Sequence, residues 1–234
     1  MKGLPAVYAA EEEAQTLIIY MKDQVTGLQV ELLYGVLPEY DVITRSAKVV
    51  NTEEDKIRLT KAQAACIDLL HGEFDVISFY GRHAMERNMQ RTPVGHGAFV
   101  IGSRRGTSSH QYNPMMILAE KETTEDAGTC YGMSFVYSGG FKAEVEKDQF
   151  GQTRMQMGLQ EEQFSYPLKK GEEFVIPEVI LTCSNQGLGK LSQNLQRCIR
   201  KNLCRGKYKE KVRPILINSW EACYFDFTGE DIYH

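Results

Sequence analysis

From Gln15 to Thr182 the sequence consists of short apolar segments separated by Gly, Asn and Asp, with no sustained helical period. Segments of this kind, rich in β-branched and aromatic residues, are typical of β-strands. Many short strands that follow one another in this way favour antiparallel sheets packed face to face. The sequence therefore predicts a mainly β protein built on a large antiparallel sandwich.

Local signals refine this expectation. Gly27 lies between two strand-like segments, so a hairpin is predicted there. The segment 56–70 is compatible with a helix or a strand, and we favour a strand because Ile57 and Leu59 alternate with polar neighbours. Proline has no backbone N–H to donate to a neighbouring strand, so Pro177 is expected to mark an edge strand or the start of a strand.

After Thr182 the apolar residues recur at the spacing of an α-helix. They are Leu188, Leu191, Leu195, Cys198, Ile199 and Leu203. The pattern predicts a helix over 188–203 that ends near Gly206. The opposite face is basic and carries Lys190, Arg197, Arg200, Lys201 and Arg205. Such a face can bind nucleic acid, but we favour a solvated surface.

A polar basic stretch follows the helix and is interpreted as a linker. Behind it, Pro214 opens the apolar run 215–217, which is typical of a strand buried on both faces in a parallel sheet. A lone parallel strand cannot cover its own faces. We therefore expect the chain to be part of a larger protein, with domains at 1–186, 187–211 and 212–234.

Composition excludes several classes of function. The chain has 27 Lys and Arg against 31 Asp and Glu, so its net charge of -4 differs from that of a typical basic nucleic-acid-binding domain. No apolar run is long enough to predict a membrane-spanning helix, and the N-terminus does not read as a signal peptide. The 6 cysteines show no CxxC pair, so we expect reduced thiols, a cytoplasmic location and no metal site.

Three segments concentrate groups that suit ligand contacts. The polar segment GRHAMER follows an expected strand, and its alternative role is a surface loop held by ion pairs between its Arg and Glu side chains. In SRRGTSSHQYNP, Arg104 and Arg105 are interpreted as stabilising the loop. Trp220 is the only Trp, and it could stack on a sugar ring or pack at a domain interface.

Together these segments resemble glycoside hydrolase family thirty-six, the bacterial type of α-galactosidase. The matching pieces follow the family's order and nearly its spacing, and they cover essentially the whole chain. Several are long and irregular, so chance explains them poorly. They are GLPAVY, YDVITRSAKVVN, GRHAMERNMQR, SRRGTSSHQYNP, YGMSFVYSGGFKAEVEKDQFGQTRMQMG and RPILINSWEACYFDF.

The resemblance implies a fold and a reaction. Members of the family begin with an antiparallel β-supersandwich, continue with a catalytic (β/α)8 barrel and end with a small β-domain. This chain is similar to the later part of the sandwich, the connecting helix and the first strand of a truncated barrel. The implied reaction is retaining hydrolysis of terminal α-linked galactose, as in melibiose and raffinose, by two aspartates about 5–5.5 Å apart.

The resemblance also implies site residues. Trp220 matches the aromatic residue that lines the galactose site, and His83 matches a sandwich position that contacts substrate, where many relatives have Trp. Asp226 matches neither catalytic aspartate, so no catalytic residue is assigned and the chain alone is predicted to be inactive. No cofactor is implied, and the complete enzyme is expected to be a homo-oligomer.

The implied partners are α-galactoside oligosaccharides, with neither nucleic acid nor membrane. One alternative is a non-catalytic carbohydrate-binding or assembly module, because a sandwich with one exposed Trp could bind sugar without hydrolysing it. Related enzymes act on N-acetylgalactosamine or transfer galactosyl groups. The residues that choose among these activities lie mostly outside this chain.

Overall fold

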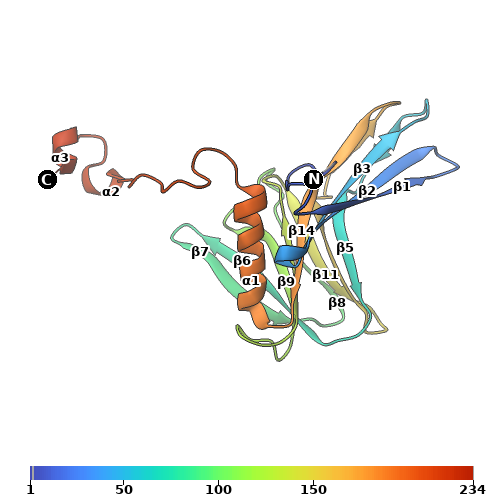
Figure 1. Ribbon diagram of the computed structural model, residues 1–234, viewed down its shortest axis with the longest axis horizontal. Coiled ribbons are helices and arrows are strands. Elements are labelled where there is room, and N and C mark those ends of the chain that lie inside the picture. The colour runs from blue at the N-terminus through green and yellow to red at the C-terminus, as the bar shows by residue number, and fades with distance from the viewer. Residues whose placement is uncertain (2, 234) are drawn as a thin grey trace. The chain divides into compact units, whose positions relative to one another are not determined.

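The computed structural model describes Met1 and residues 3–233, and the chain forms two compact units, Met1–Leu203 and Cys204–His234. The first unit is a β-sandwich with one long helix, and the second contains the short helices α2 (Trp220–Cys223) and α3 (Gly229–Tyr233) (Figure 1). Within the described residues, no helix combines the length and the apolar character that crossing a membrane requires.

The larger sheet has eight strands, and all neighbours in it are antiparallel. In spatial order they are β1 (Gln15–Lys22), β2 (Leu28–Leu37), β3 (Val42–Asn51), β14 (Glu173–Ser184), β10 (Cys130–Phe135), β9 (Tyr112–Glu120), β6 (Phe74–Arg82) and β7 (Met85–Pro93). The predicted hairpin is confirmed, because β1 pairs with β2 and Gly27, with a φ of +67°, lies in the turn between them.

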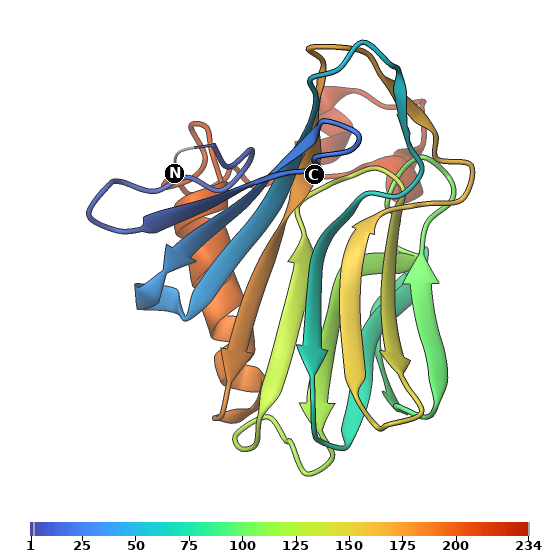
Figure 2. The ribbon, with the colours of Figure 1, turned by 90° about the vertical axis from the view of Figure 1, so that its right-hand side faces the viewer.

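The smaller sheet packs against the larger one and closes the main core (Figure 2). Its strands in spatial order are β5 (Gln63–Leu69), β12 (Thr153–Leu159), β11 (Phe141–Lys147) and β8 (Gly97–Gly102). A two-stranded sheet adds β4 (Ile57–Leu59) and β13 (Tyr166–Leu168). The strand prediction for 56–70 is thus confirmed, because β4 and β5 both fall in that segment.

Helix α1 (Gly187–Cys198) covers part of the opposite face of the larger sheet. It continues as a π-helical turn over Ile199–Leu203, so the helix prediction is confirmed. Its buried Leu191 and Leu195 belong to a second core with residues of the larger sheet. The charged side chains of Arg197 and Arg200 are exposed, as expected for a solvated face.

The expectation for Pro177 is wrong. The residue lies inside β14, a strand with β3 on one side and β10 on the other, although the pairing with β10 begins only at Val179. A proline is tolerated there because the pairing of β14 with β3 shifts register between Ile176 and Val179. The shift takes Pro177 and Glu178 out of the ladder, so the missing N–H breaks no regular hydrogen bond.

The barrel strand expected at 215–217 does not form in the second unit. Ile215 and Leu216 are 95% and 91% exposed and belong to no strand or helix. A parallel strand gains its hydrogen bonds and its cover only from neighbouring strands, and the described residues of this unit provide none. The predicted division into 1–186, 187–211 and 212–234 stays a prediction.

Candidate functional site

His83 lies at the tip of the hairpin formed by β6 and β7, and it is exposed. The pairing shifts register between Tyr80 and Arg82, just before the turn. A Cβ atom on Gly81 would lie 2.4 Å from the carbonyl oxygen of Met85, so the close approach of the two backbones at this point requires glycine. The sequence of the turn therefore fixes how His83 is presented to solvent.

Hydrogen bonds within the tip define its shape further. The Glu86 carboxylate accepts the N–H of Ala84 at 3.1 Å, and the Asn88 amide donates to the carbonyl of Met85 at 2.8 Å. Ala84 adopts a left-handed conformation with a φ of 61°. Among the described residues Glu86 forms no ion pair with an arginine. The tip is held instead by hydrogen bonds between side chains and backbone and by the contact of the Arg82 guanidinium with the Met85 sulfur at 3.1 Å.

Arg91 anchors the hairpin at its base. Its Nε donates to Asp75 on β6 at 2.6 Å, and its Nη1 donates to the carbonyl of Thr123 at 2.7 Å. Its Nη2 donates to the carbonyls of Glu120 and Lys121 at 3.0 and 2.8 Å. One guanidinium thus ties the edge strand β7 to its neighbour and to the loop after β9.

Replacing Arg91 with methionine should lower the free energy of unfolding by roughly 2–3 kcal/mol, because Asp75 loses its charged partner in a partly buried place. Chemical denaturation measures the loss, and amide exchange should rise in β6 and β7. Arg154→Met is the matched control: its ion pair with Asp68 is about half exposed, so the expected cost is under about 1 kcal/mol. Equal losses in both variants would contradict the anchoring role.

Trp220 begins helix α2 in the second unit and is 50% exposed. Its backbone N–H donates to the side-chain oxygen of Asn218 at 2.9 Å. Its ring meets those of Phe225 and Tyr224 at centroid distances of 4.8 and 5.8 Å in edge-to-face geometry. Trp220 is therefore held by neighbouring aromatic rings while half of its surface stays accessible. His83 and Trp220 belong to different units, and the structure describes each within its own unit.

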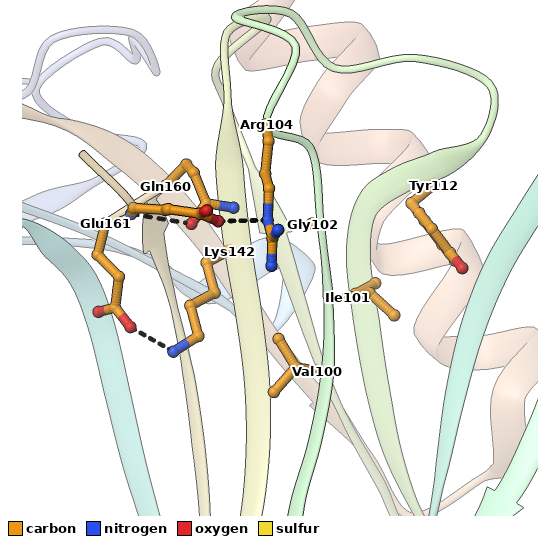
Figure 3. A pocket seen from close by; sticks show the side chains of 9 residues that line it. Val100, Ile101, Gly102, Arg104, Tyr112, Lys142, Gln160 and Glu161 are labelled. Carbon is orange, nitrogen blue, oxygen red and sulfur yellow. Dashed lines mark hydrogen bonds and ion pairs between the residues drawn. The ribbon is translucent and has the colours of Figure 1, made fainter. Parts of the chain in front are cut away.

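The segment around Arg104 borders a cavity of about 400 Å³ on the small-sheet side of the sandwich (Figure 3). We call it the Arg104 cavity. Its lining residues are Val100, Ile101, Gly102, Arg104, Tyr112, Lys142, Gln160, Glu161 and Glu162. Arg104 forms an ion pair with Glu162 at 2.5 Å and is largely exposed, so it ties two segments at the surface rather than in a buried loop.

Lys142 is the fixed charge of this cavity. Its Nζ lies 2.6 Å from a Glu144 oxygen and 2.5 Å from a Glu161 oxygen. Partial burial of the amine favours its neutral form, but the hydrogen bonds to Glu144 and Glu161 outweigh this effect and raise the pKa of Lys142. The same contact lowers the pKa of Glu161. The sequence does not indicate this site, because Lys142 and the adjacent pair Gln160 and Glu161 come from two separate segments with no motif in common.

The buried cysteines, the possible metal ligands and Asp226 do not form a further reactive site in the described residues. Burial raises the pKa of the Cys130 and Cys198 thiols to about 11, which leaves them protonated and unreactive at neutral pH. Over the described residues, no group of three His, Cys, Asp or Glu side chains is arranged to hold a metal ion. Asp226, which matched no catalytic position in the sequence, is exposed in the second unit.

Comparison with known proteins places these features in a family. Residues 1–169 match the glycosyl hydrolase family 36 N-terminal domain, and residues 173–234 match the melibiase family. The bifunctional alpha-galactosidase/sucrose kinase AgaSK of Mediterraneibacter gnavus is 62% identical over 232 residues, which are 99% of this chain and 25% of that protein. Alpha-galactosidase Mel36A of Lactobacillus acidophilus is 43% identical, over 99% of this chain and 32% of its own length.

Solved structures agree with the sequence matches. The galactosidase domain of AgaSK superposes with a TM-score of 0.94, covering 99% of this chain and 32% of that one. A double variant of alpha-galactosidase AgaA from Geobacillus stearothermophilus, solved with stachyose, also gives 0.94 at 43% identity, with the same coverage of both chains. The chain thus spans about a quarter to a third of the length of these relatives. On sequence and fold together, the chain belongs to glycosyl hydrolase family 36.

Proposed function

We propose that this chain serves an α-galactosidase that releases terminal α-linked galactose from oligosaccharides such as melibiose and raffinose, with retention at the anomeric carbon. The observation that carries the proposal is the match over 99% of the chain, in sequence and in fold, to proteins described as alpha-galactosidases. Structures of AgaA variants in complex with stachyose and with raffinose point to the same substrate class.

In this proposal Trp220 and His83 contact the substrate. Trp220 offers an accessible ring on which the apolar face of a sugar can pack. His83 stands at an exposed tip and can exchange hydrogen bonds with a sugar hydroxyl through either ring nitrogen. Retaining hydrolysis needs a pair of carboxylates, which neither residue supplies. The family resemblance matches no aspartate of this chain to that pair, so we assign binding groups and no catalytic residue to the chain.

Assays with p-nitrophenyl α-galactoside test the proposal. The complete protein that carries this chain should turn over the substrate, and the 234-residue chain alone should not. Trp220→Ala in the complete protein should lower kcat/KM roughly tenfold through the lost ring contact. Tyr208→Ala, which changes another partly exposed aromatic residue of the second unit, is the matched control and should leave kcat/KM unchanged.

Two results would contradict parts of this proposal. A complete protein without α-galactosidase activity would overturn the function, and turnover by the chain alone would overturn the statement that it holds no catalytic residue. The carbohydrate-binding module would be favoured instead by two results together. The 234-residue chain would bind raffinose with a change in the fluorescence of its single Trp, and the complete protein would not hydrolyse raffinose.

The proposal includes a cytoplasmic location and a homo-oligomeric complete enzyme. The scattered cysteines and the acidic composition support the location. Exposed apolar side chains on β1, among them Leu17, Ile19 and Met21, support association, because such side chains gain by being covered.

A further inference from the structure

We propose that the sandwich unit carries a carbohydrate-binding site of its own, the Arg104 cavity, which holds a neutral sugar unit between a polar and an apolar wall. The inference goes beyond the proposed function, because it requires neither Trp220 nor hydrolysis. The volume of the Arg104 cavity, about 400 Å³, falls in the range of roughly 300–1,000 Å³ that is usual for small-molecule sites.

The two walls of the cavity differ in chemistry (Figure 3). The polar wall consists of Arg104, Lys142, Gln160, Glu161 and Glu162. The apolar side is formed by Val100 and Tyr112, whereas Ile101, the next residue of β8, borders the cavity from the core and is 4% exposed. A sugar ring has the same division, since its hydroxyl groups point outward and its C–H faces are apolar. Planar amide, guanidinium and carboxylate groups are suited to bind neighbouring hydroxyls in pairs.

The charges of the cavity favour a neutral ligand. The lining has two cationic side chains, Arg104 and Lys142, and each is paired with a carboxylate of the lining, Glu162 and Glu161. An anion would have to displace these carboxylates from their partners. A neutral sugar can instead use the donors of the guanidinium and the oxygen atoms that the ion pairs leave accessible.

Two of the polar groups, Lys142 and Gln160, are held in place before any ligand arrives. The Lys142 side chain is 18% exposed and fixed between Glu144 and Glu161. The Gln160 amide donates to the carbonyl of Phe141 at 3.4 Å. A Cβ atom on Gly102 would come within 3.3 Å of that amide nitrogen, so the glycine leaves the space beside it open. These two side chains therefore have little entropy left to lose on binding.

The site is long enough for more than one sugar unit. A second cavity of about 290 Å³ shares Arg104, Gln160 and Glu162 with the first, so the two lie on either side of the Arg104–Glu162 pair. The rings of Tyr137 and Phe164 line this second cavity. Aromatic rings beside planar polar groups repeat the chemistry of the first cavity, which points to an oligosaccharide.

Saturation-transfer NMR with raffinose on the whole chain carrying Trp220→Ala tests the inference, because that background removes the other proposed sugar contact. Raffinose should still receive saturation. Adding Arg104→Ala should weaken its binding about tenfold, since hydrogen bonds to a charged group are lost. Gln160→Ala should also weaken it, whereas Arg154→Ala, which removes an exposed ion pair outside the cavity, should leave it unchanged.

Three outcomes would overturn the inference: loss of the raffinose signal with Trp220→Ala alone, equal binding in the Arg104→Ala and Arg154→Ala variants, or displacement of raffinose by an equal concentration of inorganic phosphate. None of them bears on hydrolysis by the complete protein. Likewise, a complete protein without hydrolytic activity would not change the result of these binding measurements. The two proposals can therefore be contradicted independently of each other.

Discussion

Truncation of Phe141 to alanine is expected to lower the free energy of unfolding of the sandwich by about 3–5 kcal/mol. Phe141 is fully buried in the core between the two sheets. It begins β11, which pairs with β8 on one side and β12 on the other. A strand paired on both sides cannot move freely into the space left by the ring, so much of the cavity should persist.

Urea denaturation followed by far-UV circular dichroism measures this loss, because the strands of the first unit dominate that signal. The midpoint should fall while the dependence of the free energy on urea stays constant. Phe150→Ala is the matched control: this side chain is 79% exposed, and its loss should change stability by under about 0.5 kcal/mol. A loss below about 1 kcal/mol for Phe141→Ala would contradict the rigid packing.

Helices and strands are predicted correctly where the spacing of apolar residues distinguishes one from the other. Alternation of Ile57 and Leu59 with polar residues predicts a strand in 56–70, a segment whose composition is also compatible with a helix, and the structure has β4 and β5 there. The change of period after Thr182 located α1, because Leu191 and Leu195 must face one side to be buried. Because these patterns lie within one segment, they can be recognised without knowing which strands pair with it.

Features that depend on distant partners could not be predicted in the same way. The Arg104 cavity brings Arg104 beside Glu162 and Lys142 beside Glu161, and no spacing in the sequence connects them. The run 215–217 carries the composition of a buried strand, but composition cannot supply the neighbours that such a strand needs. His83 and Trp220 were singled out with the help of the family resemblance, since an exposed His or Trp has no periodic signature.

Pro177 shows why the rule that proline avoids central strands fails at a β-bulge. The rule that proline avoids central strands assumes a regular ladder, and β14 interrupts its ladder at that point. The interruption turns Glu178 into the core, where it is fully buried. Its Oε2 accepts the backbone N–H groups of Ala6 and Val7 at 2.9 and 2.8 Å. The bulge thus uses one carboxylate to fasten the N-terminal segment to the sheet.

Loss of this carboxyl group in Glu178→Ala is expected to lower the free energy of unfolding by roughly 2–6 kcal/mol, because two N–H groups lose their acceptor in or near the core. Burial raises the pKa of Glu178, and the N–H groups of Val7 and Ala6 oppose this effect without cancelling it. Thr44 also lies beside the carboxyl, but its hydroxyl makes no hydrogen bond in the described structure.

The raised pKa gives the contribution of Glu178 a defined pH dependence. The folded protein holds the proton to a higher pH than the unfolded chain, whose Glu178 ionises near 4.5. Stability from this group is therefore full below about pH 4.5 and is lost as pH rises through the folded pKa. Glu178→Gln keeps an acceptor oxygen for both N–H groups and cannot ionise, so it should match the unmutated protein in acid and exceed its stability at pH 8.

Urea denaturation of Glu178→Gln, Glu178→Ala and the unmutated chain between pH 4 and 8 separates charge from hydrogen bonding. The difference between Glu178→Gln and the unmutated protein isolates this group, because all other titrations are common to both. Cys198, whose pKa is raised chiefly by its own burial and further by Glu178, stays protonated over this range. If that difference is constant with pH, or if Gln costs as much as Ala, then Glu178 does not hold its proton in the folded state, and the buried bulge must be stabilised through the charged carboxylate instead.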